Sequence, residues 1–313
     1  MMNHVAIIIV HYNQVQVTWE GIASLMGASY RKFDIVVVDN GLNQTDQAFF
    51  KQQCLNSGFT FRIVEGNLPC LLFDGTIFWH TAEKNLGYGG GMNLGARIAG
   101  ASLPDFLLLL NNDIISQVNF LGNLLQAIDG VRDQSDFGFA GCLIHSWPHK
   151  EIWYAGGKLN LTRCMGEHLI NYPKSSDIQE TGFVTGCCML CRPDVYQKLG
   201  GMDERFFLYL EDVDLCYRAI KKGYKLFFVP SAELFHRVGS STGGDEKPLS
   251  VHYSSRNRIL MMRKHFNGLI LYRFYTFFFF SRLLKILKWI LLGKMNLIAF
   301  LWKGVIEGFT AKK

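Results

Sequence analysis

Runs of apolar residues separated by helical patterns predict an α/β protein. Residues 5–10 and 34–38 are rich in β-branched side chains, as is typical of central strands covered on both faces. The stretch 17–26 between them has a helical pattern, so the three segments form a βαβ unit. Residues 106–110 are the most apolar strand of the chain. We therefore expect a mainly parallel central sheet flanked by helices.

Polar residues follow the first two predicted strands. His11 and Asn13 come after the first strand, and Asp39 ends the second. In parallel sheets, ligands bind beyond the carboxyl ends of the strands, so these three side chains are candidates for ligand binding. An aspartate at a strand end can accept hydrogen bonds from a nucleotide base or ribose, or it can cap the next turn. The residues alone leave both roles open for Asp39.

A polar triplet, Asn111, Asn112 and Asp113, follows the strand at 106–110. Such a triplet in the expected ligand crevice suits a divalent cation. Asp113 carries the only full charge of the three and is the candidate metal ligand, although one carboxylate needs a substrate diphosphate and a further side chain to complete the site. His236 ends a later apolar run, before a glycine-rich loop, and is equally consistent with a ligand or a structural role.

A glycine run lies in the segment 84–101. Gly87, Gly89, Gly90 and Gly91 precede a helix expected to begin near Met92. Glycines before a helix allow backbone amides to approach a diphosphate closely. The run is neither a Walker loop nor a complete dinucleotide fingerprint, and a merely flexible turn remains the alternative.

The segment 201–222 predicts a buried approach followed by a short amphipathic helix. Glu211, Asp212 and Asp214 stand at the positive end of this helix. Compensation of the helix dipole explains such acids on any helix, and for Asp214 it is as good an explanation as a functional one. Glu211 and Asp212 lie where an apolar loop meets the helix, so we expect them to line a cleft. A carboxylate there is a candidate general base for deprotonating a hydroxyl.

Composition narrows the class of protein. The chain has 313 residues, of which 49% are hydrophobic, so disorder is excluded, and its net charge of +6 is too modest for a nucleic-acid-binding protein throughout. The CxxC formed by Cys188 and Cys191 lies in an apolar run and has no partner pair at zinc-finger spacing, so we expect buried thiols. No secretory signal is expected at the N-terminus, which favours reduced thiols and a cytoplasmic location.

The C-terminal segment 266–313 differs in composition from the rest. It is mostly apolar but is interrupted by basic residues, namely Arg273, Arg282, Lys285, Lys288, Lys294 and Lys303. No uncharged stretch reaches the roughly 18 to 20 residues of a spanning helix. We expect a basic amphipathic tail at the membrane interface, after a catalytic domain at 1–265. A helical oligomer contact or a core-packing tail is the alternative.

Eight motifs, in this order, resemble the family 2 inverting glycosyltransferases with the GT-A fold, especially their bacterial rhamnosyltransferase-like branch. The motifs are IIIVHYN, VVVDNG, NLGYGGGMNLG, LLLLNND, FVTGCCMLCRPDVY, GGMDERFFLYLEDVDLCYRAIKKGY, FHRVGSSTG and YSSRNRILMMRKH. They cover most of residues 5–265. The tail lies outside them, and the resemblance says little about it.

The resemblance implies roles for particular residues. Asp39 is similar to the residue that contacts the donor's base, and Asn85 lies in the motif that lines the nucleotide pocket, with Gly87 and Gly90. Asn111, Asn112 and Asp113 stand where the family has its D-x-D motif. An Asn replaces the first Asp there, which leaves Asp113 as the main ligand of Mg²⁺ or Mn²⁺.

The same resemblance makes His236 a second metal ligand or a diphosphate contact, and Asp212 of the Glu211–Asp212 pair the catalytic base. It implies inverting transfer of a sugar, foremost rhamnose from dTDP-rhamnose, to a hydroxyl of a lipid-linked or polysaccharide acceptor in cell-surface glycan synthesis such as that of O-antigen. Docked by its basic C-terminal tail, the enzyme would be peripheral at the inner face of the membrane. Transfer of another hexose or N-acetylhexosamine from a UDP donor and a non-catalytic nucleotide-sugar-binding scaffold are the alternatives. A nicotinamide oxidoreductase is disfavoured because no G-x-G-x-x-G follows the first strand.

Overall fold

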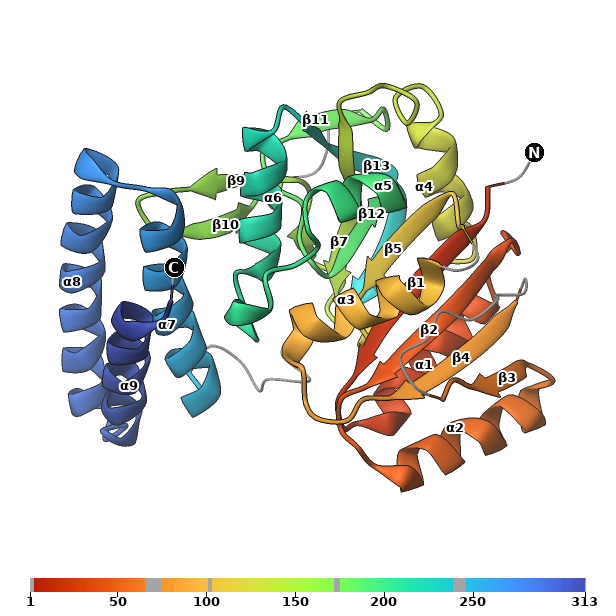
Figure 1. The fold of residues 1–313 in the computed structure, drawn as a ribbon, viewed down its shortest axis with the longest axis horizontal. Helices are drawn as coiled ribbons and strands as arrows, with labels where there is room; N and C mark the ends of the chain where they lie inside the picture. The colour runs from red at the N-terminus through yellow and green to blue at the C-terminus, as the bar shows by residue number, and fades with distance from the viewer. Residues whose placement is uncertain (1–2, 66–74, 101–102, 172–174, 239–245, 313) are drawn as a thin grey trace.

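The computed structural model describes residues 3–65, 75–100, 103–171, 175–238 and 246–312 (Figure 1). Its strands are β1 (Val5–His11), β2 (Phe33–Asp39), β3 (Thr60–Ile63), β4 (Thr76–Thr81), β5 (Phe106–Leu110), β6 (Ile114–Ser116), β7 (Phe137–Ser146), β8 (Ile152–Tyr154), β9 (Gly157–Asn160), β10 (Met165–His168), β11 (Gln179–Thr181), β12 (Cys188–Cys191) and β13 (Lys225–His236). Its helices are α1 (Val15–Met26), α2 (Gln44–Ser57), α3 (Gly87–Ala99), α4 (Phe120–Ile128), α5 (Pro193–Lys198), the short 3-10 helix η2 (Glu204–Phe206), α6 (Glu211–Lys221), α7 (Pro248–His265), α8 (Gly268–Leu291) and α9 (Asn296–Thr310).

One large sheet organises the described residues, with strand order β11-β13-β7-β12-β5-β1-β2-β4-β3. The half from β5 to β3 is parallel throughout. In the other half, β12 runs antiparallel to both β5 and β7, and β13 returns parallel to β7. Figure 1 shows α3 on the near face of the sheet and α1 on the far face. The predicted α/β class with a mainly parallel sheet is confirmed.

Some predicted strands differ from the observed ones. The apolar run at 183–191 predicts one strand, but the observed strand is confined to β12, because the chain turns before it and the amide of Gly186 donates to Asp212 Oδ2. Pro230 predicts a break after a strand at 224–229, but β13 continues through this residue with a register shift. Strand β4 was not predicted. The irregular, aromatic sequence of 147–181 predicts a loop-rich insertion, but this segment carries β8 to β11.

Helix α3 begins at Gly87, earlier than the start near Met92 that the sequence predicts, so Gly89 to Gly91 are helical. The glycines allow α3 to lie very close to the sheet. A Cβ at Gly95 would stand 2.2 Å from Ile8 Cγ2, and one at Gly91 would stand 2.6 Å from Val10 Cγ2. The helix therefore rests directly on β1, and its first turn reaches the carboxyl edge of the sheet.

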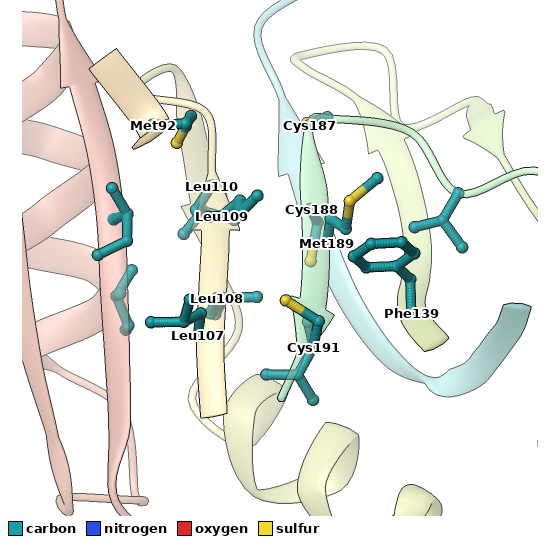
Figure 2. Close-up of a cluster of buried hydrophobic side chains, with 14 of the residues drawn as sticks. Met92, Leu107, Leu108, Leu109, Leu110, Phe139, Cys187, Cys188, Met189 and Cys191 are labelled. Carbon is teal, nitrogen blue, oxygen red and sulfur yellow. The ribbon is translucent and has the colours of Figure 1, made fainter. Parts of the chain in front are cut away.

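The CxxC lies in the core, as predicted. Cys188 and Cys191 are fully buried in β12 between the leucines of β5 and the side chain of Phe139 (Figure 2). The seven cysteines in the described ranges are all buried and free.

The C-terminal helices pack on the preceding domain. Gly304 and Gly308 of α9 lie against the backbone of α7, where added Cβ atoms would stand 2.3 Å from the carbonyl oxygen of His252 and 2.7 Å from that of Arg256. Phe274 and Phe278 of α8 belong to the same buried cluster as the sheet residues. Within the described ranges, no helix is both long and apolar enough to cross a bilayer.

Candidate active site

The carboxyl ends of β1, β2 and β5 meet at one edge of the sheet. His11 is paired with Asp39 across β1 and β2, and Ile9 with Leu110 across β1 and β5. The polar residues that follow these strands are therefore neighbours, which is the arrangement that the sequence pattern predicted.

Asp39 is buried at the end of β2. Its Oδ1 accepts a hydrogen bond of 2.8 Å from the amide of Gly41, and its Oδ2 is buried without a hydrogen-bond partner. Burial raises the pKa of Asp39, partly offset by the Gly41 amide and by the charge of His11. Asn13, on the exposed surface, has a left-handed backbone with φ of 54° and lies beside Gly41. An acceptor oxygen without a partner at this edge is available to a donor group of a ligand.

His11 and Asn112 lie beneath this edge. The ring nitrogens of His11 bond to Thr18 Oγ1 and Asp46 Oδ2, each at 2.9 Å, and the side chain is fully buried. The Asn112 amide donates to the same Thr18 hydroxyl at 2.8 Å. This polar chain ties β1 and β5 to α1 and α2. Both residues were predicted to bind the donor, and the structure gives them a supporting position.

The start of α3 is held against the carboxyl end of β2. Asn85 is exposed, and its Oδ1 accepts from the Gly87 amide at 2.9 Å, while Asn40 Nδ2 donates to the Gly87 carbonyl at 2.8 Å. Gly87 has φ of 70°, and a Cβ there would lie 2.2 Å from the Phe207 carbonyl oxygen. Only glycine fits this contact, which joins α3 to the loop before α6. Gly90 is buried in the first turn.

Asp113 and His236 form the second part of the site. His236 Nε2 lies 3.0 Å from Asp113 Oδ1 and 3.4 Å from Asn111 Nδ2. The other ring nitrogen of His236, Nδ1, is buried without a hydrogen-bond partner. The His236 ring packs edge-on against the Trp153 ring, with 4.6 Å between the ring centroids. The structure thus brings together the two predicted metal ligands. The loop 239–245, which follows His236 in the family motif, lies outside the described residues.

These residues fit a divalent cation. The 3.0 Å separation equals about the distance between neighbouring ligands in an octahedral shell of radius ~2.1 Å. A carboxylate and an imidazole suit Mn²⁺, and Mg²⁺ through the oxygen ligand. In the described ranges, no group of three or more His, Cys, Asp or Glu side chains could hold a metal ion.

Glu211 and Asp212 begin α6, after three non-glycine residues with left-handed backbone, Phe207, Tyr209 and Leu210. Asp212 is half-buried. Its Oδ2 accepts from the Gly186 amide at 2.9 Å and its Oδ1 from the Val213 amide at 2.8 Å. Glu211 is 6% exposed, and its Oε2 is buried without a hydrogen-bond partner.

The two acids differ in their protonation. Burial, together with the charge of Asp212, raises the pKa of Glu211 to about 8. Burial also raises the pKa of Asp212, but the amides of Gly186 and Val213 stabilise its anion. Two adjacent carboxyl groups in such surroundings ionise separately. The pKa of Glu211 is therefore the more strongly raised of the two, which favours Asp212 as the ionised member of the pair.

The protonation of Glu211 gives a testable dependence of stability on pH. The folded pKa of about 8 lies above the ordinary value of 4.5, so the folded protein holds a proton that the unfolded chain releases between these pH values. Stability should therefore fall as pH rises through this window, by up to ~1.4 kcal/mol per pH unit. Glu211→Gln should flatten this slope, as measured by urea unfolding at pH 5, 7 and 9. Parallel slopes for the two proteins would contradict the assignment.

A short segment connects the two parts of the site. The backbone amide of Gly186 donates a hydrogen bond to Asp212. The backbone carbonyl of the next residue, Cys187, accepts one of 3.0 Å from the backbone amide of Asn111. Burial raises the pKa of the Cys187 thiol, and the charges of Asp113 and Asp212 raise it further. The turn at Gly186 and Cys187 thus links the segment of the predicted base, through Asp212, to the segment of the predicted metal ligand, through Asn111.

Three contributors were not identified from the sequence. The hydroxyl of Tyr88 donates to the Gly186 carbonyl at 2.6 Å, the backbone of Gly186 holds Asp212, and Asn40 holds the start of α3. Tyr88 and Asn40 lie inside the quoted motifs NLGYGGGMNLG and VVVDNG, which was the signal available for them.

Asp214 has a different role from its two neighbours. It is fully buried and accepts from Arg218 Nε, Lys264 Nζ and His265 Nε2, each at 2.6 Å. This ion cluster binds α6 to α7. Its partners explain this acid better than the helix dipole does.

Two family models match the chain, and several named proteins are similar to parts of it. The model of glycosyl transferase family 2 matches residues 6–200, and that of glycosyl transferase family group 2 matches residues 122–309. N-acetylglucosaminyl-diphospho-decaprenol L-rhamnosyltransferase of Mycobacterium tuberculosis is 44% identical over 75 residues, which cover 24% of this chain and 24% of that protein. Rhamnosyltransferase WbbL of Escherichia coli is 27% identical over 141 residues, which cover 42% of this chain and 52% of that protein. The chain thus spans about a quarter and about half of these relatives' lengths.

Among solved structures, mannosyltransferase PcManGT from Pyrobaculum calidifontis in complex with GDP-Man and Mn²⁺ has the same fold. The TM-score is 0.61 at 12% identity, over 100% of this chain and 89% of that chain. The expected GT-A fold is confirmed. Because a family model matches more than half of its residues, the chain belongs to glycosyl transferase family 2.

Proposed function

We propose that this protein is an inverting glycosyltransferase that moves a sugar from a nucleoside diphosphate donor to an acceptor hydroxyl. One observation carries the proposal. Asp212 accepts a hydrogen bond from the amide of Gly186, and the carbonyl of the next residue, Cys187, accepts one from the backbone amide of Asn111, whose side chain lies beside the Asp113–His236 pair. A base beside a cation and diphosphate site is what a single displacement at an activated sugar carbon requires.

Asp212 would act as the general base. Its carboxylate takes the proton of the acceptor hydroxyl while the hydroxyl oxygen forms a bond to the anomeric carbon. The bond from that carbon to the donor's phosphate oxygen breaks at the same time, and the nucleoside diphosphate leaves with the electron pair. Attack from the opposite face inverts the anomeric configuration. The raised pKa of Asp212 makes it a stronger base than an exposed aspartate.

Asp113 and His236 would hold a divalent cation, with Asn111 beside them. When bound, Mg²⁺ or Mn²⁺ stabilises the negative charge of the diphosphate. Asp39, with its unpaired buried Oδ2, would accept a hydrogen bond from the base or ribose. The start of α3 lies at the same edge of the sheet, where Asn40 and Phe207 hold it.

Rhamnose from dTDP-rhamnose is the proposed sugar, and a lipid-linked or polysaccharide hydroxyl is the proposed acceptor. Support comes from the two relatives, which are both named as rhamnosyltransferases. A UDP-hexose or UDP-N-acetylhexosamine is the alternative donor.

The test is to incubate the protein and Mn²⁺ or Mg²⁺ with a panel of nucleotide sugars, with and without lipid-linked acceptors. Mass spectrometry identifies the product, and NMR gives its anomeric configuration. Transfer of rhamnose with inversion supports the full proposal. Transfer of another sugar would show that the proposed donor is wrong while the proposed reaction holds. Absence of transfer and of donor hydrolysis across the panel favours a non-catalytic scaffold.

We also propose that α8 and α9 bind the surface of an anionic membrane on its cytoplasmic side. Residues 266–313 contain eight basic residues and one acidic residue. Large apolar side chains stand exposed between the basic ones, among them Leu284 at 68%, Leu291 at 86% and Trp302 at 54%. A largely apolar cavity of about 260 Å³, lined by Phe278, Arg282 and Trp302 among others, opens between the two helices. Apolar side chains among cations fit the headgroup boundary of anionic lipids.

Leu284→Asp combined with Leu291→Asp should weaken binding to phosphatidylglycerol vesicles at least ~10-fold, because each exposed leucine contributes about 1.5 kcal/mol or more when it enters the lipid. Flotation with vesicles measures the effect, and phosphatidylcholine vesicles should bind the parent protein weakly. Leu55→Asp, at an equally exposed leucine of α2, is the matched control. Equal binding of all three proteins would argue against this surface.

A further inference from the structure

Helix α7 holds the loop that leads to the acid pair. Asn257 is fully buried in α7, and its side-chain amide nitrogen lies 2.7 Å from the carbonyl oxygen of Phe206, 2.8 Å from that of Leu208 and 2.8 Å from that of Tyr209. One side-chain amide thus lies within hydrogen-bond distance of three carbonyls of the turn that ends two residues before Glu211. No part of the site described above uses Asn257.

The loop has a backbone that needs such support. Phe207, Tyr209 and Leu210 have φ of 61°, 70° and 69°. A left-handed non-glycine residue is strained and persists only where the surroundings impose it. The carbonyls that converge on Asn257 can do so only while this turn is kept. Loss of the amide would leave buried acceptors unpaired and remove the main restraint on the turn.

Other contacts fix Asn257 and the loop in one arrangement. Arg256 Nη1 donates to Asn257 Oδ1 at 2.6 Å and to the Arg205 carbonyl at 2.7 Å, which orients the Asn257 amide. The Tyr209 hydroxyl is 2.9 Å from Ser250 Oγ, also on α7. On the opposite side, the Phe207 carbonyl accepts from the Tyr88 amide at the start of α3. The loop is therefore held between α3 and α7.

We propose that Asn257 is a positioning residue for glycosyl transfer, which sets the direction of Glu211 and Asp212 by fixing the backbone of 206–210. It does not contact substrate in this role. The inference rests on the proposed function for its kinetic readout. It adds that the acid pair is aligned from the C-terminal helical layer and not only from its own helix.

A simple structural role predicts a different result from a positioning role. A structural residue changes the fraction of folded protein, and the folded molecules keep their kcat. A positioning residue changes kcat in fully folded protein, because a small misplacement of a base can cost 10²-fold, while KM for the donor stays near that of the parent.

The experiment compares Asn257→Ala with Ile259→Val, a mild core substitution at a fully buried neighbour on the same helix. With the nucleotide sugar that the parent uses, Asn257→Ala should lower kcat at least ~10-fold with KM for the donor within about threefold. Ile259→Val should keep the parent's kcat. Asn257→Ser, which retains one donor, should give an intermediate kcat. Should the alanine variant not fold, the serine variant decides by the same criterion.

A kcat equal to that of the parent in a folded Asn257 variant, or a loss matched by Ile259→Val, overturns the proposal. Amide hydrogen exchange separates this outcome from failure of the proposed function. In Asn257→Ala, the amides of 206–213 should exchange at least ~10-fold faster while those of α3 stay unchanged, whether or not the parent transfers sugar. Unchanged exchange in 206–213 also overturns the proposal.

Discussion

Asp212→Asn is expected to lower the rate of glycosyl transfer by at least ~10²-fold while donor binding stays close to that of the parent. The amide cannot take the proton of the acceptor hydroxyl. It keeps the size of the carboxylate, and its oxygen can still accept from one of the two amides, Gly186 or Val213. Initial-rate measurements give kcat, and calorimetry with the nucleoside diphosphate gives the dissociation constant.

The neighbouring acid supplies the contrast. Because the pKa of Glu211 is raised to about 8, this side chain is already neutral at pH 7, and Glu211→Gln should lose less than ~10-fold in kcat. Asp194→Asn, which removes an acid paired with Lys198 on α5, controls for the loss of a charge. If Asp212→Asn turned over at nearly the parent's rate, Asp212 would not be the base. If Glu211→Gln suffered the larger loss, the roles of the two acids would be exchanged.

Asp113→Ala is the second substitution with a large expected effect, and it should act on binding. Asp113 is the carboxylate of the Asp113–His236 pair, whose Oδ1 and Nε2 atoms lie 3.0 Å apart. Its removal should therefore weaken the binding of the cation and of the diphosphate together. Loss of a ligand should exceed the ~10- to 100-fold that loss of a supporting partner costs. Calorimetric titration of dTDP and UDP, each with and without Mn²⁺, measures the effect.

The parent should bind nucleotide more tightly with the metal than without it, and Asp113→Ala should lose this difference. His236→Ala should change binding in the same direction, since it removes the second ligand. Asp133→Ala, at an acid whose side chain is 90% exposed, is the control for charge. Metal-dependent binding that survives in Asp113→Ala would exclude Asp113 as a ligand.

The sheet was predictable because its strands carry their own signal. The segments 5–10, 34–38 and 106–110 are buried on both faces, so each is continuously apolar and can be found without knowledge of its neighbours. Strand β4 was not predicted because its run of apolar residues is short and follows a segment whose sequence has neither a helical nor a strand pattern. The start of α3 was predicted too late because glycines indicate a turn, whereas here they allow the helix to pack so close to β1 that a Cβ at Gly95 would stand 2.2 Å from Ile8 Cγ2.

The candidate site was predicted as a set of residues but not as a geometry. The motifs and their order along the chain were enough to select Asp113, His236, Glu211 and Asp212 as candidates. The pattern could not show that His11 points into the core, because its partner Asp46 belongs to a later helix. Nor could the pattern predict that the pKa values of Glu211 and Asp212 differ, since this difference depends on burial and on the amide of Gly186.

The sequence by itself determined the α/β class, the family and the residue types of the site, because local apolar patterns and short motifs carry that information. Only the tertiary structure showed that burial raises the pKa of Glu211 more strongly than that of Asp212, that His11 and Asn112 bond to Thr18 inside the fold, and that Asn257 holds the turn before α6. The physical reason is that burial, hydrogen bonding and charge at each site come from elements distant in the chain. Those neighbours exist only once the sheet and its helices have assembled.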